Sequence, residues 1–436
     1  VREAWKDGEV VVNVPRIVDD YEFELFVPAH ASATADSHSI YGQPLSRVTV
    51  PSVRELSDFS DAHSGWEIHG MEDPLAQFLA REYPQKLEPS LDLFSVMNID
   101  IEVEHSNGFP DPVRAEQEVL SITMKRFGQP SITLGLKPLN RPGYFKCHDE
   151  ADLLETFLVF YERRIPDIIT GWNVELFDIT YLVNRISKII DSKAPNRLSP
   201  FVGKCRNPIQ ERTDYRGEAY YKILGVTTVD YLELYKKFSP DKQESYSLGF
   251  IAEEELGDTK VDLEPWGNSL MRLYREEFPT FIEYNEKDVL LVERLDDKLQ
   301  FLLNLVAITF MVKGRVEDSQ ATVKPWDTLI YNMILPLGMQ PPPHPKPSAS
   351  QIVGGFVKEP IPGLEKWVVV FDLASLYPNI ARTLNMSPET IAIRGTPCIE
   401  EILAGLPLDI QPGMALAANG SQYRQDKVGI IPLAMG

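Results

Sequence analysis

Cysteine and long apolar runs are scarce in this sequence. Its 436 residues include only three cysteines, which lie far apart at Cys147, Cys205 and Cys398. This spacing gives neither a disulfide framework nor a metal site, and it is typical of a reducing cytoplasm. No stretch reaches the roughly 18–20 apolar residues that a membrane span needs. The apolar run from Phe301 to Val312 is too short to span a membrane and predicts a buried helix. We therefore expect no membrane segment.

The sequence also lacks an initiator methionine, a signal segment and an excess of basic residues. The start has no basic-then-apolar pattern, so nothing indicates secretion, and we expect that the true N-terminus is missing. The 43 basic and 64 acidic residues give a net charge of −21. That balance disfavours nucleic acid as a partner, because proteins bind phosphate groups mainly through lysine and arginine. An enzyme that acts on phosphodiesters through metal ions, however, needs carboxylates at its centre. Excess acid is more commonly solvated surface, so net charge decides little.

Alternating strand and helix patterns predict an α/β layer domain after a loop-rich β region of about 90 residues. Strands are predicted at 93–103, 119–127, 132–136 and 168–171, and helices at 150–164 and 178–190. Further on, a strand is predicted at 227–234 and helices at 247–256 and 278–303. A proline cluster, from Pro341 to Pro347, predicts an extended connector and a domain boundary. An apolar strand at 366–371 and a helix from about Tyr377 should follow.

Acidic residues occur at positions where they could act together. Asp100 and Glu102 are two apart on a predicted strand, so both side chains should lie on one face. Asp178 follows the strand 168–171, and Tyr284 and Asp288 are one helical turn apart. Alone, each feature is more often a solvated edge strand, a helix N-cap or an exposed helical pair. Together, four carboxylates and a tyrosine predict a site for two divalent cations, the arrangement that polymerases and nucleases use. The tyrosine hydroxyl would orient the attacking water.

Five ordered motifs give the sequence a resemblance to the family B DNA polymerases. Three resemble the exonuclease motifs of the family: DIEV at 100–103, NVELFD at 173–178 and YNEKD at 284–288. GGFVKEP at 354–360 resembles the loop between the exonuclease and palm domains, and FDLASLYP at 371–378 resembles the first palm motif. Stretches such as 229–239 and 385–392 are similar to the replicative members from T-even-type bacteriophages. The resemblance runs from about residue 90 to the end.

The resemblance implies a multi-domain α/β (α+β) protein with a ribonuclease-H-like exonuclease domain. Residues 1–92 would be the first segment of a mixed β amino-terminal domain, and 93–300 the 3′–5′ exonuclease domain. Residues 301–347 would return to the amino-terminal domain through the proline-rich linker. Residues 348–436 would be the first part of the palm, ending before the fingers.

The resemblance also implies roles for residues in the exonuclease site. Mg²⁺, for which Mn²⁺ could substitute, would bind in a two-metal site. The four ligands would be Asp100, Glu102, Asp178 and Asp288, with Tyr284 positioning the nucleophilic water. Asn173 and Phe177 would lie near the frayed 3′ end of the DNA, where stacking on an unpaired base contributes about 1–3 kcal/mol.

For the palm, the resemblance implies that Asp372 and the Leu373 carbonyl bind polymerase metals. Backbone amides of Ser375, Leu376 and Tyr377 would meet a deoxynucleoside triphosphate, and Gly354 and Gly355 would contact template DNA. Partners would be primer-template DNA, a single-stranded 3′ end and a C-terminal polymerase portion, through which a sliding clamp would bind. The protein would work in the cytoplasm of an infected bacterium.

The sequence departs from the family pattern in lacking the second palm carboxylate motif and the fingers helix. We therefore expect an N-terminal portion that cannot extend a primer alone, either as a split subunit or as a truncated sequence. Two alternatives stay open. A free-standing 3′–5′ exonuclease would not need the FDLASLYP motif, and a non-catalytic nucleic-acid-binding module would not need four carboxylates.

Overall fold

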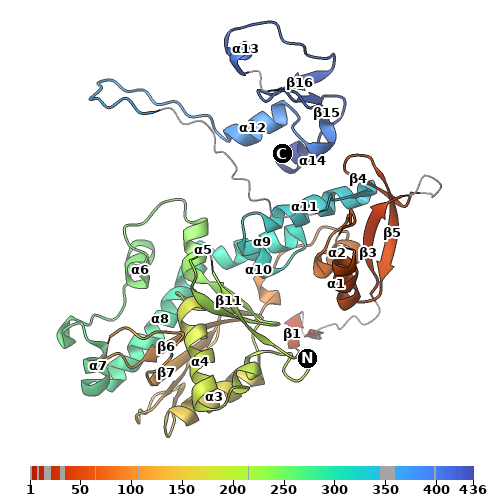
Figure 1. Ribbon diagram of the computed structural model, residues 1–436. Helices are drawn as coiled ribbons and strands as arrows, with labels where there is room; N and C mark the ends of the chain where they lie inside the picture. Colours follow the sequence, from red (N-terminus) through yellow and green to blue (C-terminus); the bar gives the residue numbers. More distant parts are fainter. Residues whose placement is uncertain are drawn as a thin grey trace.

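The computed structural model describes most of the chain as three groups of elements (Figure 1). The described residues are 2–6, 9–13, 21–29, 35–63, 65–106, 108–214, 216–343, 359–396 and 399–436. Gly354, Gly355 and Cys398 lie outside them, as does most of the GGFVKEP motif. Within these ranges, every helix is too short or too polar to cross a membrane.

A small four-stranded sheet lies near the start of the chain. Its order is β14-β4-β5-β3, and a short pair, β1 (Arg2–Lys6) with β2 (Glu9–Asn13), precedes it. Two helices accompany the sheet, α1 (Val53–Ala62) and α2 (Pro74–Glu82). The strands are β3 (Phe23–Pro28), β4 (Ser37–Ser39), β5 (Pro44–Val50) and β14 (Met339–Gln340). Because β14 pairs with β4 about 300 residues earlier, the chain returns to this sheet after the central region.

The central sheet has six strands in the order β13-β10-β6-β7-β8-β9. Strands β13, β10 and β6 run parallel, whereas β6 and β7 are antiparallel, as are β7 and β8. The predicted strands at 93–103, 119–127, 132–136 and 168–171 all form, three of them slightly shorter. The bounds are β6 (Val96–Val103), β7 (Val119–Arg126), β8 (Ile132–Gly135), β9 (Tyr144–Lys146), β10 (Ile168–Gly171) and β13 (Thr227–Asp230).

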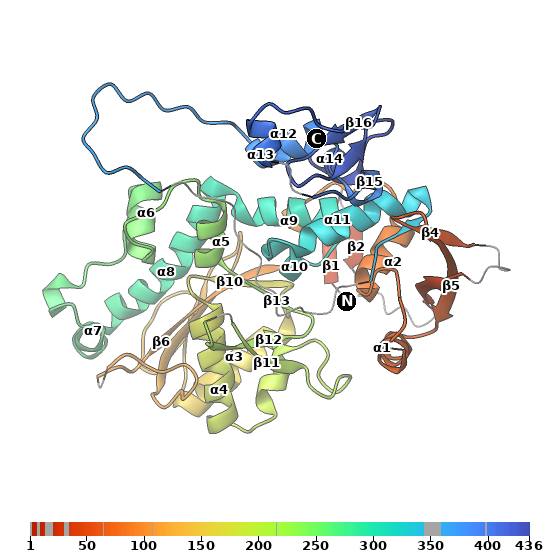
Figure 2. The same ribbon diagram turned by 45° about the horizontal axis from the view of Figure 1, so that its top comes forward.

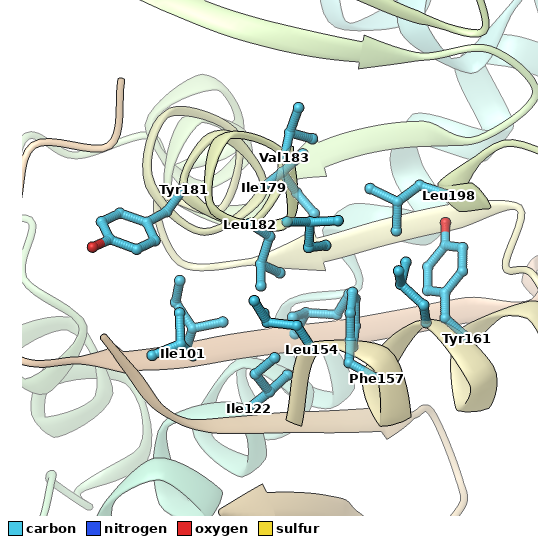
Figure 3. Close-up of a cluster of buried hydrophobic side chains, with 14 of the residues drawn as sticks. Ile101, Ile122, Leu154, Phe157, Tyr161, Ile179, Tyr181, Leu182, Val183 and Leu198 are labelled. Atoms are coloured by element: carbon cyan, nitrogen blue, oxygen red, sulfur yellow. The ribbon is translucent and has the colours of Figure 1, made fainter. Parts of the chain in front are cut away.

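Helices cover both faces of this sheet. On one face, α3 (Glu150–Arg163) and α4 (Thr180–Ile189) place Leu154, Phe157 and Leu182 against Ile101 and Ile122 of the sheet (Figure 3). On the other face, α8 (Phe278–Leu299) packs on β6 and β7. Around α8 lie α5 (Tyr231–Phe238), α6 (Leu248–Leu256), α7 (Leu270–Glu276) and α9 (Phe301–Val312). The sheet is therefore the middle of a three-layer arrangement.

Two predicted elements end earlier than their apolar patterns indicate. The strand at 227–234 stops at Asp230, because the Asp230 carboxylate accepts the amide of Leu232 at 3.0 Å and caps α5. The helix at 278–303 divides at Gln300, which has a left-handed backbone with φ 56°. There the Asp296 carboxylate accepts the Leu302 amide at 2.9 Å, so it supports the start of α9. In both places a buried aspartate satisfies an amide at a helix start.

A hairpin packs beside α4, and two helices lead from the central region toward the small sheet. A hairpin of β11 (Ile209–Thr213) and β12 (Ala219–Ile223) follows α4. Helices α10 (Val316–Gln320) and α11 (Lys324–Ile334) continue from α9 toward the small sheet (Figure 2). Tyr331 of α11 packs with Met71, Ala76 and Ala80 from the amino-terminal region.

The last part of the chain forms a three-stranded sheet, β15-β17-β16, with three helices. Its bounds are α12 (Leu376–Thr383), β15 (Ile391–Ile393), α13 (Ile399–Leu403), β16 (Met414–Leu416), β17 (Gln422–Arg424) and α14 (Ile430–Ala434). The predicted strand at 366–371 is wrong for this structure. Trp367 and Phe371 are 97% and 91% exposed, and no described segment pairs with this stretch. A strand exists only through hydrogen bonds to a neighbour, so an apolar run without one stays extended and solvated.

Candidate metal-dependent nuclease site

Strand β6 presents its acids on one face. Its core side chains, among them Ile99 and Ile101, belong to the cluster under α3 and α4. Asp100 and Glu102 alternate with them and therefore face α8, as the period of two predicts. One carboxylate oxygen from each lies within 4.8 Å of the other and of an oxygen of Asp288 on α8. The structure thus brings together three of the four predicted carboxylates from two elements far apart in sequence.

The fourth carboxylate, Asp178, reaches the same strand from the other side. It lies in a π-helical turn, Glu175–Ile179, between β10 and α4, and such turns are frequent at functional sites. Asp178 is almost fully buried, and its Oδ1 accepts the Ile101 amide at 2.9 Å. It does not cap α4, which begins at Thr180. The alternative reading of Asp178 as an ordinary N-cap is therefore wrong, although Asp178 lies outside the 4.8 Å group.

The turn that carries Asp178 is fixed by a close approach of backbone at Gly171. A Cβ atom there would lie 2.7 Å from the Ile99 carbonyl oxygen and 2.9 Å from Cβ of Val174. Glycine allows β10 to end directly against β6. The Asp230 carboxylate also accepts the amides of Asn173 and Glu175, at 3.0 and 3.2 Å. Together these contacts hold the turn at the end of β6.

The electrostatics of the site are unfavourable without a cation. Burial, reinforced by the Asp288 carboxylate, raises the pKa of Asp100 to about 8. Burial and the neighbouring acids likewise raise the pKa values of Glu102 and Asp178 well above their ordinary range. In addition, Oδ1 of Asp288 is buried without a hydrogen-bond partner among the described residues. A buried acceptor and crowded carboxylates fit a divalent cation, for which carboxylate oxygens are hard ligands.

One cation of the chain already lies in this site. The Lys260 ammonium forms an ion pair with the Asp288 carboxylate and lies 3.3 Å from the Tyr284 hydroxyl. Burial alone would lower the pKa of Lys260, but Asp288, Tyr284 and Asp100 together hold that pKa above its usual value. Sequence reasoning missed Lys260, because it follows α6 in an irregular segment and no spacing rule links it to α8.

Aromatic side chains border the site beside Asp178. Phe177 contacts Phe109 with ring centroids 5.4 Å apart, and Phe109 itself is 84% exposed. Asn173, the other residue predicted to lie near a DNA end, has a left-handed backbone with φ 64°, which asparagine tolerates well. Phe109 was also missed, although an aromatic residue in a Gly-Phe-Pro loop just after a predicted metal-binding strand is a usable signal.

The predicted palm residues do not join this site. Asp372 and Leu373 are exposed in the extended stretch before α12, outside any described strand. Ser375 precedes α12 with φ 51°, and Tyr377 in its first turn is 84% exposed. Among the described residues, the carboxylate cluster that could hold a metal is the one formed by Asp100, Glu102 and Asp288.

Two family models match the chain. The family model described as "DNA polymerase family B, exonuclease domain" matches residues 76–251, which include Asp100, Glu102 and Asp178. A second model, "DNA polymerase family B", matches residues 307–432.

Several curated proteins are similar to the chain. The DNA-directed DNA polymerase of Escherichia phage RB69 is 32% identical over 95% of this chain and 49% of its own length. The DNA-directed DNA polymerase of Enterobacteria phage T4 is 29% identical over 92% of the chain and 48% of its own length. DNA polymerase II of Escherichia coli K12 is 28% identical over 54% of the chain and 30% of its own length. The chain thus spans about half the length of the two phage relatives.

Proposed function

This chain belongs to family B of the DNA polymerases, and we propose that it carries the 3′–5′ proofreading exonuclease and the first palm segment of a phage-type replicative polymerase. Membership confirms the mixed α/β fold class expected of a ribonuclease-H-like exonuclease domain. The observation that carries the proposal is the convergence of the Asp100, Glu102 and Asp288 carboxylates beside β6. Asp178 reaches the same strand through its hydrogen bond with the Ile101 amide.

The proposed cofactor is Mg²⁺, with Mn²⁺ as a substitute. The ligands would be Asp100, Glu102, Asp178 and Asp288, a set of hard oxygen donors. When bound, two such cations would stabilise both the attacking and the leaving oxygen during cleavage of the terminal phosphodiester. The raised pKa values of the carboxylates and the unpartnered Asp288 oxygen support this assignment, because a cation would satisfy both.

The other side chains of the site would position the substrate and the water. Burial raises the pKa of Tyr284 above its usual value, so its hydroxyl keeps its proton and can orient the attacking water. Phe177 and the exposed Phe109 form a ring pair on which an unpaired 3′-terminal base would stack. Asn173 would lie near that end of the DNA. This arrangement favours a single-stranded 3′ end over paired duplex.

Substitution of Asp178 by asparagine tests the nuclease directly. The new Oδ1 can still accept the Ile101 amide, so the fold should persist while one charged ligand is lost. Metal stabilisation of the reaction is worth several kcal/mol, so we expect cleavage of labelled single-stranded DNA to fall at least about 100-fold. The control is Asp297→Asn, the same change at an exposed residue of α8. A folded Asp178→Asn protein that digests DNA as fast as the parent would overturn the proposal.

The match covers about half of each phage relative, and polymerisation would need a counterpart of the other half as well. We propose that Asp372 and the Leu373 carbonyl contribute to a polymerase metal site, with Ser375, Leu376 and Tyr377 contacting a deoxynucleoside triphosphate. Gly354 and Gly355 would touch template DNA. The exposed apolar stretch 366–371 supports a missing neighbour, because a C-terminal portion could supply its strand partners. A sliding clamp would bind through that portion, and the work would take place in the cytoplasm of an infected bacterium.

Primer extension by residues 1–436 separates the two halves of the proposal. Alone, the chain should degrade a primer and not extend it, whereas a supplied C-terminal polypeptide should permit template-directed extension. Extension by the chain alone would show that carboxylates of this chain other than Asp372 complete the polymerase site. The match of residues 307–432 to the polymerase family counts against a free-standing exonuclease.

A further inference from the structure

A buried side-chain amide of α8 links the proposed metal ligand Asp100, on β6, to the neighbouring strand β7. Asn285 of α8 is fully buried, and its Nδ2 donates to Oδ2 of Asp100. The same Nδ2 lies 3.4 Å from the Asp100 carbonyl oxygen. On the other side, Oδ1 of Asn285 accepts hydrogen bonds from the Ser121 and Thr123 hydroxyls at 3.0 and 2.6 Å. Both hydroxyls come from β7, where Thr123 is paired with Asp100.

These contacts fix the orientation of the amide. The Asp100 backbone carbonyl can only accept a hydrogen bond, and so can the Asp100 carboxylate once it is ionised, so the NH₂ end of Asn285 must face Asp100. The two hydroxyls then donate to the other end, and Oγ1 of Thr133 lies 3.0 Å from Oγ1 of Thr123 behind them. The Asn285 amide and the three hydroxyls each have a hydrogen-bond partner, which makes the network rigid. One oxygen of Asp100 is thereby held by the protein, and the other is left for a cation.

We propose that Asn285 is a positioning residue, which sets the rotamer of Asp100 for metal binding and is itself held by Ser121 and Thr123. The proposal rests on the nuclease function proposed above. The metal-binding step can nevertheless be measured without DNA. Partners that orient metal ligands typically change metal affinity 10- to 100-fold when removed.

The test is Mn²⁺ titration by calorimetry on the whole chain carrying Asn285→Leu. We expect the Mn²⁺ dissociation constant to rise 10- to 100-fold, with the lost nuclease rate partly restored at saturating Mn²⁺. The control is Asn98→Leu, because Asn98 is also fully buried between β6 and α8. Asn98 donates to the Val289 carbonyl oxygen at 2.7 Å, and among the described residues its side chain makes no hydrogen bond to Asp100. Both variants should lower the thermal midpoint, but only Asn285→Leu should change the Mn²⁺ constant.

A second pair of variants applies if Asn285→Leu does not fold. Thr123→Val removes the hydroxyl that holds Asn285 and keeps the shape, so Mn²⁺ binding should weaken about two- to tenfold. Thr123→Ser should restore it. Equal Mn²⁺ constants for the parent, Asn285→Leu and Thr123→Val would overturn the positioning role, as would equal weakening by Asn98→Leu. Normal Mn²⁺ binding without nuclease activity in the parent would overturn only the proposed function.

Discussion

Replacing Glu102 by glutamine should stabilise the metal-free protein while abolishing the nuclease. When ionised, Glu102 adds a negative charge within 4.8 Å of carboxylate oxygens of Asp100 and Asp288. Its pKa is raised first by burial and then by these two acids, whereas Lys260 opposes the shift. Glutamine has nearly the same shape and no charge. The variant therefore removes repulsion from the fold and, in the same step, a ligand from the site.

The size of the effect follows from the geometry. Two unit charges 4.8 Å apart interact by roughly 1 kcal/mol in water and about 3.5 kcal/mol at an effective dielectric constant of 20. Glu102 meets Asp100 and Asp288 and, more weakly, Asp178, against one ammonium, so at least one repulsive pair remains uncompensated. We expect Glu102→Gln to raise the free energy of unfolding by about 1–3 kcal/mol without divalent ions. For a domain of about 200 residues, that corresponds to a thermal midpoint higher by about 2–10 °C.

Thermal unfolding at mildly alkaline pH, with a chelator and then with excess Mn²⁺, measures this directly. With the chelator, the variant should have a higher thermal midpoint than the parent. With Mn²⁺, the midpoint of the parent should rise more than that of the variant, so the difference between them should disappear. The control is Glu283→Gln, at an exposed position of α8, which should change the free energy of unfolding by no more than about 0.5 kcal/mol. If Glu102→Gln melts at the parent's temperature in chelator, or retains full cleavage of single-stranded DNA, the carboxylates do not form the site described.

Three further outcomes are expected. Gly171→Ala should force the turn at the end of β10 to move and lower cleavage roughly 10- to 100-fold, whereas Gly249→Ala, with only ordinary contacts around the added Cβ, should not. Phe109→Ala should weaken single-stranded DNA binding by about 1–3 kcal/mol in fluorescence anisotropy, with Phe145→Ala as the control. Burial and neighbouring acids raise the folded-state pKa of Glu175 to about 7, above its unfolded value, so its contribution to stability is lost as pH rises toward 7. Glu175→Gln should therefore gain up to about 3 kcal/mol over the parent above that pH in denaturant melts and nothing near pH 4.

The sequence could predict those parts of the site that depend on local periodicity. Asp100 and Glu102 share a face because any strand alternates its side chains, and this held independently of the rest of the fold. The grouping with Asp178 and Asp288 was predicted from the combination of acids on an α/β scaffold, and then from the family resemblance, because periodicity does not link separate elements. Lys260 and Asn285 could not be predicted, because their roles arise only when α8 and the segment after α6 pack beside β6.

At the apolar stretch 366–371, local sequence preference predicted a strand that does not form. Its residues have strong strand propensity, and Val368, Val369 and Val370 are β-branched. Propensity describes how well a side chain fits a pleated, half-buried surface, and no described segment offers that surface here. The same pattern was reliable for β6 and β7, which lie between neighbours inside a sheet covered by helices.

Net charge argues against the proposed nucleic-acid partner, and the geometry of the site gives a physical reason to discount it. The chain carries −21 overall, yet a phosphodiester would meet only the charges at the end of β6. Four carboxylates and the Lys260 ammonium give that site a formal charge of −4 + 1 = −3, which repels a phosphate. Two divalent cations would change it to −3 + 4 = +1, which attracts one. Four of the 64 acids that argue against nucleic acid in a composition count are therefore the groups that would make its hydrolysis dependent on metal.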